Sequence, residues 1–127
     1  MKDYLVYHNP DQRGVDVTEV EPFAIVTDKP APRGVIGSRV WLLTGRGRPR
    51  TFLLRSYFIV DQVETGGVRF QTRLSGEKGK VFQPMLELNH EEWFDALKRN
   101  QRNFASGLQS IKDERFVRGL EELAGAR

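Results

Sequence analysis

Residues 39–63, RVWLLTGRGRPRTFLLRSYFIVDQV, decide the fold. Residues 39–44 alternate apolar side chains toward both faces of an extended chain, which is typical of a central sheet strand or a barrel wall. Residues 51–63 are a run of β-forming residues long enough to pair with two neighbours, with a bulge expected near Arg55 and Ser56. Residues 45–49 form the glycine-containing turn that connects the two runs.

Further β-structure is expected on both sides of this stretch. The first strand should stop at Asn9, because the following proline removes a ladder donor. Residues 28–37 contain two prolines and two glycines and predict a loop, and Gly66-Gly67 predicts a turn. The additional strands are expected at residues 4–7, 23–27, 68–74 and 81–82.

Helix-forming residues dominate after residue 88. Asn89 with Glu92 fits a capping box for a helix that runs to about residue 102 and buries Trp93, Phe94 and Leu97. Asp113 opens a second amphipathic helix that ends at Gly125. With no repeat or linker, residues 1–127 predict one domain, β-rich over 1–88 and helical over 89–127. The expected class is α+β: a curved, mainly antiparallel sheet or small open β-barrel with flanking helices.

Charge is distributed unevenly along the chain. Residues 1–28 hold six acids and two bases, whereas residues 29–60 hold seven bases and no acid. Arginine forks suit phosphate oxygens and stack on bases, so this block predicts contact with RNA or DNA. The alternative is an ordinary basic surface. The residues expected to contact nucleic acid are Arg39, Arg46, Arg48, Arg50 and Arg55.

Several function classes have no support in the sequence. The chain has no cysteine and only two histidines, which are far apart, and it lacks the common nucleophile, zinc-protease and phosphate-loop motifs. We therefore expect no catalytic residues, metal or cofactor. The N-terminus carries no apolar run, so neither a signal peptide nor a membrane span is expected and the cytoplasm is the default location.

Aromatic side chains beside the arginine block offer faces on which a base stacks. Trp41 and Tyr57 are the expected stacking residues, and Trp41 is expected to point into a cleft. The alternative for both is the hydrophobic core. His8 lies at the end of the first strand, where it either lines a pocket or makes a hydrogen bond within a loop.

Residues 4–10 (YLVYHNP), 37–42 (GSRVWL) and 52–63 resemble the PUA-like superfamily, in particular its EVE and ASCH branches. The resemblance covers about half of the chain. It implies a small β-barrel with a pocket for a modified base, walled by Asn9 and Trp41, and with the loop of residues 46–50 near the nucleic-acid backbone. Ser38 stands where those domains commonly carry an acid, and the helical C-terminal third departs from them.

The expected function is therefore a nucleic-acid-binding module that reads a modified or unpaired base in RNA or DNA. Two alternatives stay open. One is a protein-interaction or regulatory module whose partner has an acidic surface, and the other is a hydrolase acting on RNA, as some ASCH-like domains are.

Overall fold

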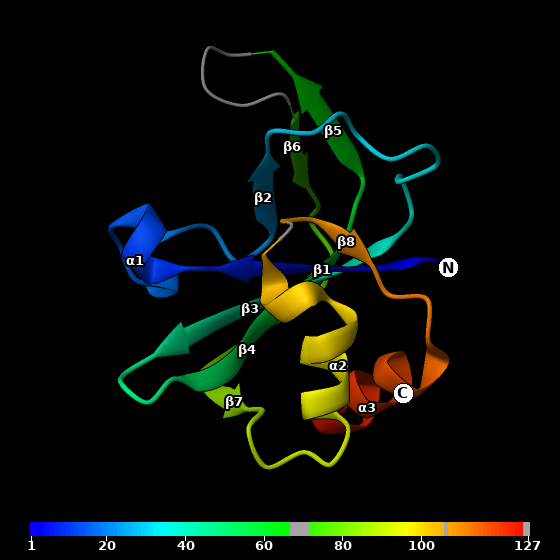
Figure 1. Cartoon of the computed structure of the whole chain (residues 1–127). Helices are drawn as coiled ribbons and strands as arrows, with labels where there is room; N and C mark the ends of the chain where they lie inside the picture. Colours follow the sequence, from blue (N-terminus) through cyan, green and yellow to red (C-terminus); the bar gives the residue numbers. More distant parts are fainter. Residues whose placement is uncertain (67–71, 106, 126–127) are drawn as a thin grey trace.

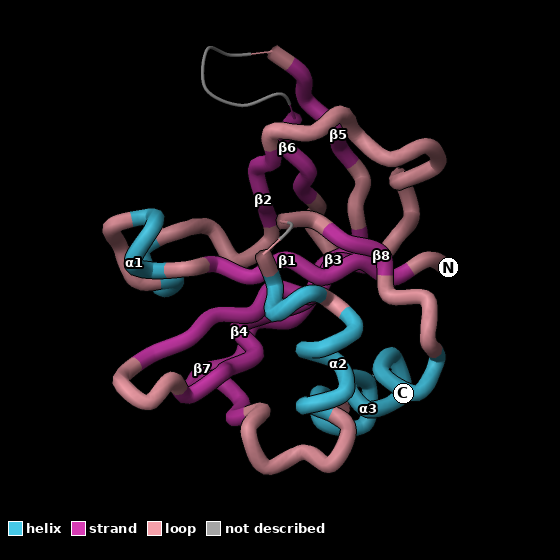
Figure 2. Tube along the Cα trace, in the orientation of Figure 1, coloured by secondary structure: helices cyan, strands magenta, loops and turns pink. Residues whose placement is uncertain are grey.

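The computed structural model describes residues 1–66, 72–105 and 107–125, which form two sheets with helices beside them (Figures 1 and 2). The five-stranded sheet has the order β7-β4-β3-β1-β8 and contains β1 (Asp3–His8), β3 (Arg39–Arg46), β4 (Thr51–Ile59), β7 (Gly79–Glu87) and β8 (Gln109–Ser110). The three-stranded sheet has the order β2-β6-β5 and contains β2 (Ala24–Thr27), β5 (Gln62–Thr65) and β6 (Thr72–Ser75). The helical elements are α1 (Pro10–Arg13), η1 (Val17–Glu19), α2 (Phe94–Asn100), η2 (Arg102–Phe104) and α3 (Glu114–Ala124).

This arrangement confirms the α+β class, but the described strands do not close into a barrel. All paired strands are antiparallel except β1 and β3, which run parallel with Asp3 opposite Arg39. Parallel neighbours require a crossover connection. Here the crossover is residues 9–38, which leave β1, supply β2 to the other sheet and return to the start of β3.

The central strand β3 is buried on both of its faces, as the sequence predicted. On one face, Trp41 and Leu43 pack in a core with α2 and α3. On the other face, Val40 and Leu42 pack in a second core with residues of the three-stranded sheet. The expected bulge is confirmed, because the pairing of β4 with β7 shifts register between Leu54 and Ser56.

The strand expectations need two adjustments. The long run at 51–63 divides into β4 and β5, so the chain passes from one sheet to the other near Val60. The strand expected at 68–74 is described only as β6, because residues 67–71 lie outside the described part of the chain, as does half of the Gly66-Gly67 turn.

The capping box at Asn89 is wrong, because α2 begins only at Phe94 and has no side-chain cap. Asn89 instead binds the backbone at the start of β4. Its Oδ1 accepts from the Phe52 amide at 2.6 Å, and its Nδ2 donates to the Arg50 carbonyl at 3.2 Å. The second helix is confirmed. Asp113 caps α3 by accepting from the Arg115 amide, and Gly125 ends it in the left-handed region.

A buried charge network joins the first strand, the central strand and the last helix. Arg39 donates to Asp3 at 2.6 Å and to Glu121 at 2.9 Å. The Trp41 indole Nε1 donates to the same Asp3 oxygen at 2.9 Å, and the Arg39 guanidinium lies 4.7 Å from the Trp41 ring centroid. The Arg39 side chain is only 9% exposed, so its charge depends on these partners.

Replacing Arg39 by Ala should lower the free energy of unfolding by about 3–5 kcal/mol, because the buried Asp3 carboxylate loses its counter-charge. Urea denaturation measures the loss. Arg118→Ala, which removes an exposed arginine from α3, is the control and should change stability little. Equal stability of the two variants would contradict the structural role of Arg39.

Candidate functional site

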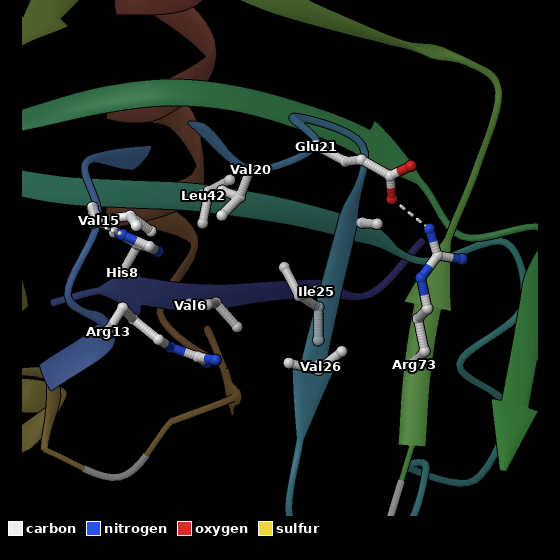
Figure 3. Close-up of a pocket in the computed structure, with 11 residues that line it drawn as sticks. Val6, His8, Arg13, Val15, Val20, Glu21, Ile25, Val26, Leu42 and Arg73 are labelled. Carbon is white, nitrogen blue, oxygen red and sulfur yellow. Dashed lines mark hydrogen bonds and ion pairs between the residues drawn. The ribbon is translucent and has the colours of Figure 1, made fainter. Parts of the chain in front are cut away.

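A cavity of about 320 Å³ lies between the two sheets, and we call it the intersheet cavity (Figure 3). The five-stranded sheet contributes to its wall from β1 and β3, and the three-stranded sheet from β2 and β6. Residues between α1 and β2 complete it. Its aliphatic lining consists of Val6, Val15, Val20, Ala24, Ile25, Val26 and Leu42, and its polar lining consists of His8, Arg13, Glu21 and Arg73.

His8 is held in place by one hydrogen bond. Its Nε2 lies 2.9 Å from the Val15 carbonyl oxygen, and because a carbonyl only accepts, Nε2 carries the proton. In the neutral ring, Nδ1 is then an acceptor, and it makes no hydrogen bond to any residue that the structure describes. The bond also fixes the wall of the cavity, because it ties the segment after α1 back to β1.

Two arginines reach this cavity in different electrostatic states. Arg73 is paired with Glu21 and, at 3.1 Å, with Glu64. The Arg13 side chain makes no hydrogen bond or ion pair within residues 1–66, 72–105 and 107–125, although its backbone amide donates to the Asn9 carbonyl. In Figure 3 its side chain extends from the end of α1 toward Val6 and Val26. Arg13 therefore supplies a guanidinium that the fold itself does not use.

The expected arginine surface is partly neutralised by acids from the N-terminal segment. Arg46 binds the Asp16 carboxylate with two hydrogen bonds, of 3.0 and 2.7 Å. Arg50 and Arg48 share Asp11, at 2.7 and 3.4 Å. The Arg48 side chain is 84% exposed and makes the longest of these contacts. Of the three, Arg48 is the residue best placed to meet a phosphate.

Other predicted contact residues lie away from the surface. Arg39 belongs to the buried network, and Arg55 is buried with its Nε unpartnered in the described structure. Trp41 has no exposed area and packs 5.0 Å from the Tyr57 ring, which is itself packed against the helical core. The expectation that Trp41 points into a cleft is therefore wrong, because α2 and α3 cover that face of β3. The core alternative describes both aromatic residues.

The structure brings His8 to the intersheet cavity and Asn9 to a groove beside it, which shares Val6, Arg13 and Val26 with the cavity. Asn9 also caps α1, because its Oδ1 accepts from the Asp11 amide at 3.0 Å. Sequence reasoning missed Arg13 and Arg73. Arg13 stands in an acid-rich segment, and Arg73 reaches the cavity only through the long-range pairing of β2 with β6.

Comparisons of the chain with protein-family models, curated proteins and solved structures gave no match. The described residues contain no cluster of three or more histidine, aspartate or glutamate side chains suited to a metal ion. Within the same part of the chain, no helix is long and apolar enough to cross a membrane. The assignment of function therefore depends on the geometry of the cavity and its rim.

The pairing of Asp16 should make stability depend on pH. Hydrogen bonds from Arg46 and Thr18 hold the pKa of Asp16 well below its ordinary value of 3.8, so the carboxylate stabilises the fold above that pH and loses this effect as pH falls below it. Asp16→Asn keeps a residue that can cap η1 but removes the charge. The gap in melting temperature between wild type and variant should therefore be widest near neutral pH and close toward pH ~2.

Differential scanning fluorimetry over this pH range measures the gap. Asp28→Asn, at an exposed position, is the matched control for the loss of one carboxylate. A gap for Asp16→Asn that stays constant from neutral to acid pH would show that the pair with Arg46 does not stabilise the fold.

Proposed function

We propose that the protein binds RNA or DNA and holds one unpaired or flipped base in the intersheet cavity. The observation that carries this proposal is a cavity of about 320 Å³ with aliphatic walls and an unpaired arginine at its edge. This volume lies at the small end of the range for ligand pockets, about 300–1,000 Å³. It suits a base with its sugar better than a larger organic ligand.

The chemistry of the lining fits the two kinds of surface on a base. The flat faces are apolar, and proteins sandwich them between aromatic or aliphatic side chains. Val6, Val20 and Ile25 would contact those faces. The edges carry donors and acceptors, for which the rim provides the acceptor Nδ1 of His8 and the guanidinium donors of Arg13.

An exposed arginine paired with the helix α1 would supply the sequence-independent part of binding. Arg48 stands on the β3–β4 turn and pairs with Asp11, which belongs to the helix that ends at Arg13. A phosphate that approached this region would compete with Asp11 for Arg48. The PUA-like assignment belongs to the same proposal and is supported by the short motifs of β1, β3 and β4.

A protein-interaction role for the arginine block has less support from the structure. Arg46 and Arg50 already hold carboxylates of their own chain, so an acidic partner would have to displace Asp16 and Asp11. Binding of an acidic partner by these arginines would also leave the intersheet cavity without a function.

Filling the cavity should abolish base binding without unfolding the protein. Val15 lines the cavity and is 38% exposed, so Val15→Trp places an indole into it from a connecting segment that tolerates bulk. Binding of labelled single-stranded RNA and DNA, followed by fluorescence anisotropy, should weaken by about 1–3 kcal/mol, the contribution of one held base.

The matched control is Ile36→Trp, which adds the same side chain at an exposed apolar position that does not line the cavity. This variant should bind as the wild type does. Weakening by both variants equally would place the binding surface elsewhere, and binding by neither the wild type nor the variants would refute the proposed function.

Phosphate contacts should make the binding sensitive to salt. The logarithm of the association constant should fall linearly with the logarithm of salt concentration. For a single strand, the slope is about −0.7 for each phosphate that the protein neutralises. Arg48→Gln should make this slope shallower by about one such contact. A slope near zero for the wild type would exclude the charged contacts.

A further inference from the structure

A left-handed turn lines the groove beside the intersheet cavity. Arg102, Asn103 and Phe104 have φ values of +52°, +54° and +64°, and none of them is glycine. Left-handed backbone costs a non-glycine residue roughly 1–2 kcal/mol, and such strain collects at ligand sites. Asn103 tolerates this region, but Arg102 and Phe104 do not favour it, so tertiary contacts must hold the turn.

Two contacts hold the turn from either side of Asn103. Phe104 is buried and stacks on Tyr7 with the ring centroids 5.4 Å apart. Gln101, before the turn, is also buried, and its Nε2 donates to the Ser110 carbonyl at 3.3 Å. Asn103 itself is exposed and lines the groove beside the cavity. The left-handed backbone therefore places the amide side chain of Asn103 at that groove.

The groove has a volume of about 860 Å³ and a lining that differs from that of the cavity. Neutral hydrogen-bonding side chains reach it from three elements: Asn9 and Gln12 around α1, Thr27 at the end of β2, and Asn103. Amides and hydroxyls both donate and accept, so they can pair with the hydroxyls of a sugar and can donate to the oxygens of a phosphodiester. The charged residues of its lining are Arg13, Lys29 and Asp28.

The groove and the cavity meet at Arg13. Val6, Arg13 and Val26 line both spaces, so a ligand in the cavity continues into the groove past the Arg13 side chain. The guanidinium has no partner among the described residues. An arginine at the junction of an apolar cavity and an amide-lined groove matches the order of groups along a strand: base with its sugar, linking phosphate, next sugar.

We infer that the groove is a second subsite, which takes the sugar and phosphate of the nucleotide next to the held base, with Arg13 on the linking phosphate. This inference rests on the proposed function and specifies its ligand as a strand of two or more nucleotides. A free base or nucleoside fills only the cavity.

Isothermal titration with two sets of probes tests this subsite. The first set is adenosine, cytidine, guanosine and uridine, and the second is the corresponding dinucleoside monophosphates ApA, CpC, GpG and UpU. For the base that binds most tightly, the dinucleotide should bind at least about tenfold more tightly than the nucleoside. Arg13→Gln should remove most of this ratio, because the linking phosphate loses its guanidinium partner and dinucleotide binding weakens more than nucleoside binding does.

Arg118→Gln is the charge-matched control, because Arg118 is exposed and lines neither space. It should keep the full ratio. Asn103→Gly separates binding from folding: glycine adopts the left-handed turn without strain, so melting temperature should rise while dinucleotide affinity falls. A residue with only a structural role would not show these opposite changes.

The outcomes distinguish the two proposals. If nucleosides bind and Val15→Trp blocks them, but dinucleotides bind no more tightly, the second subsite is refuted and the base-binding cavity stands. A tighter dinucleotide whose advantage survives Arg13→Gln also refutes the subsite as described. If neither set of probes binds the wild-type protein, both proposals are refuted.

Discussion

The structure depends on the burial of β3 on both faces. Every residue of this strand from Arg39 to Gly45 is buried, so the chain has to supply an apolar cover twice. The C-terminal helices cover the face that carries Trp41, and the three-stranded sheet covers the face that carries Leu42. The helices pack against the Trp41 face. The Leu42 face is covered by the small three-stranded sheet and by the irregular segments that connect it to the rest of the chain. The intersheet cavity lies on that side, with Leu42 in its wall.

Pairing between distant charges decides which arginines are available to a ligand. Along the sequence, acids and bases occupy separate segments, and that separation suggests a cationic surface. The fold brings the segments together, because α1 and η1 lie where Asp11 and Asp16 reach the arginines of the β3–β4 turn. Exposed pairs of this kind add little to stability, but they lower the local positive charge. Arg13 has no such partner among the described residues and is left facing the cavity and the groove.

Local patterns predicted what local forces determine. The two-faced apolar pattern of β3, the bulge at Arg55 and the Asp113 cap of α3 depend on residues close in sequence, and the structure confirms all three. The Asn89 cap failed because its amide meets the backbone of β4, 37 residues away, which no local pattern records. Trp41 was misplaced for a related reason: the sequence shows that its face of the strand is apolar but not that helices cover it. The site was predicted least well, since only His8 and Asn9 of the expected pocket line the cavity or the groove.

The residues that stabilise the fold are largely different from those proposed to bind nucleic acid, and the two groups differ in their hydrogen-bond partners. Arg39 and Trp41 both donate to Asp3 in the interior, and Arg39 also donates to Glu121, so these bonds stabilise the fold. Arg13 is exposed, has no described partner and stands where two hollows join. His8 combines both roles, because one ring nitrogen fixes the cavity wall through Val15 and the other is not used by the described fold. The second nitrogen therefore stays available at the wall of the cavity, where a donor group on a ligand would pair with it.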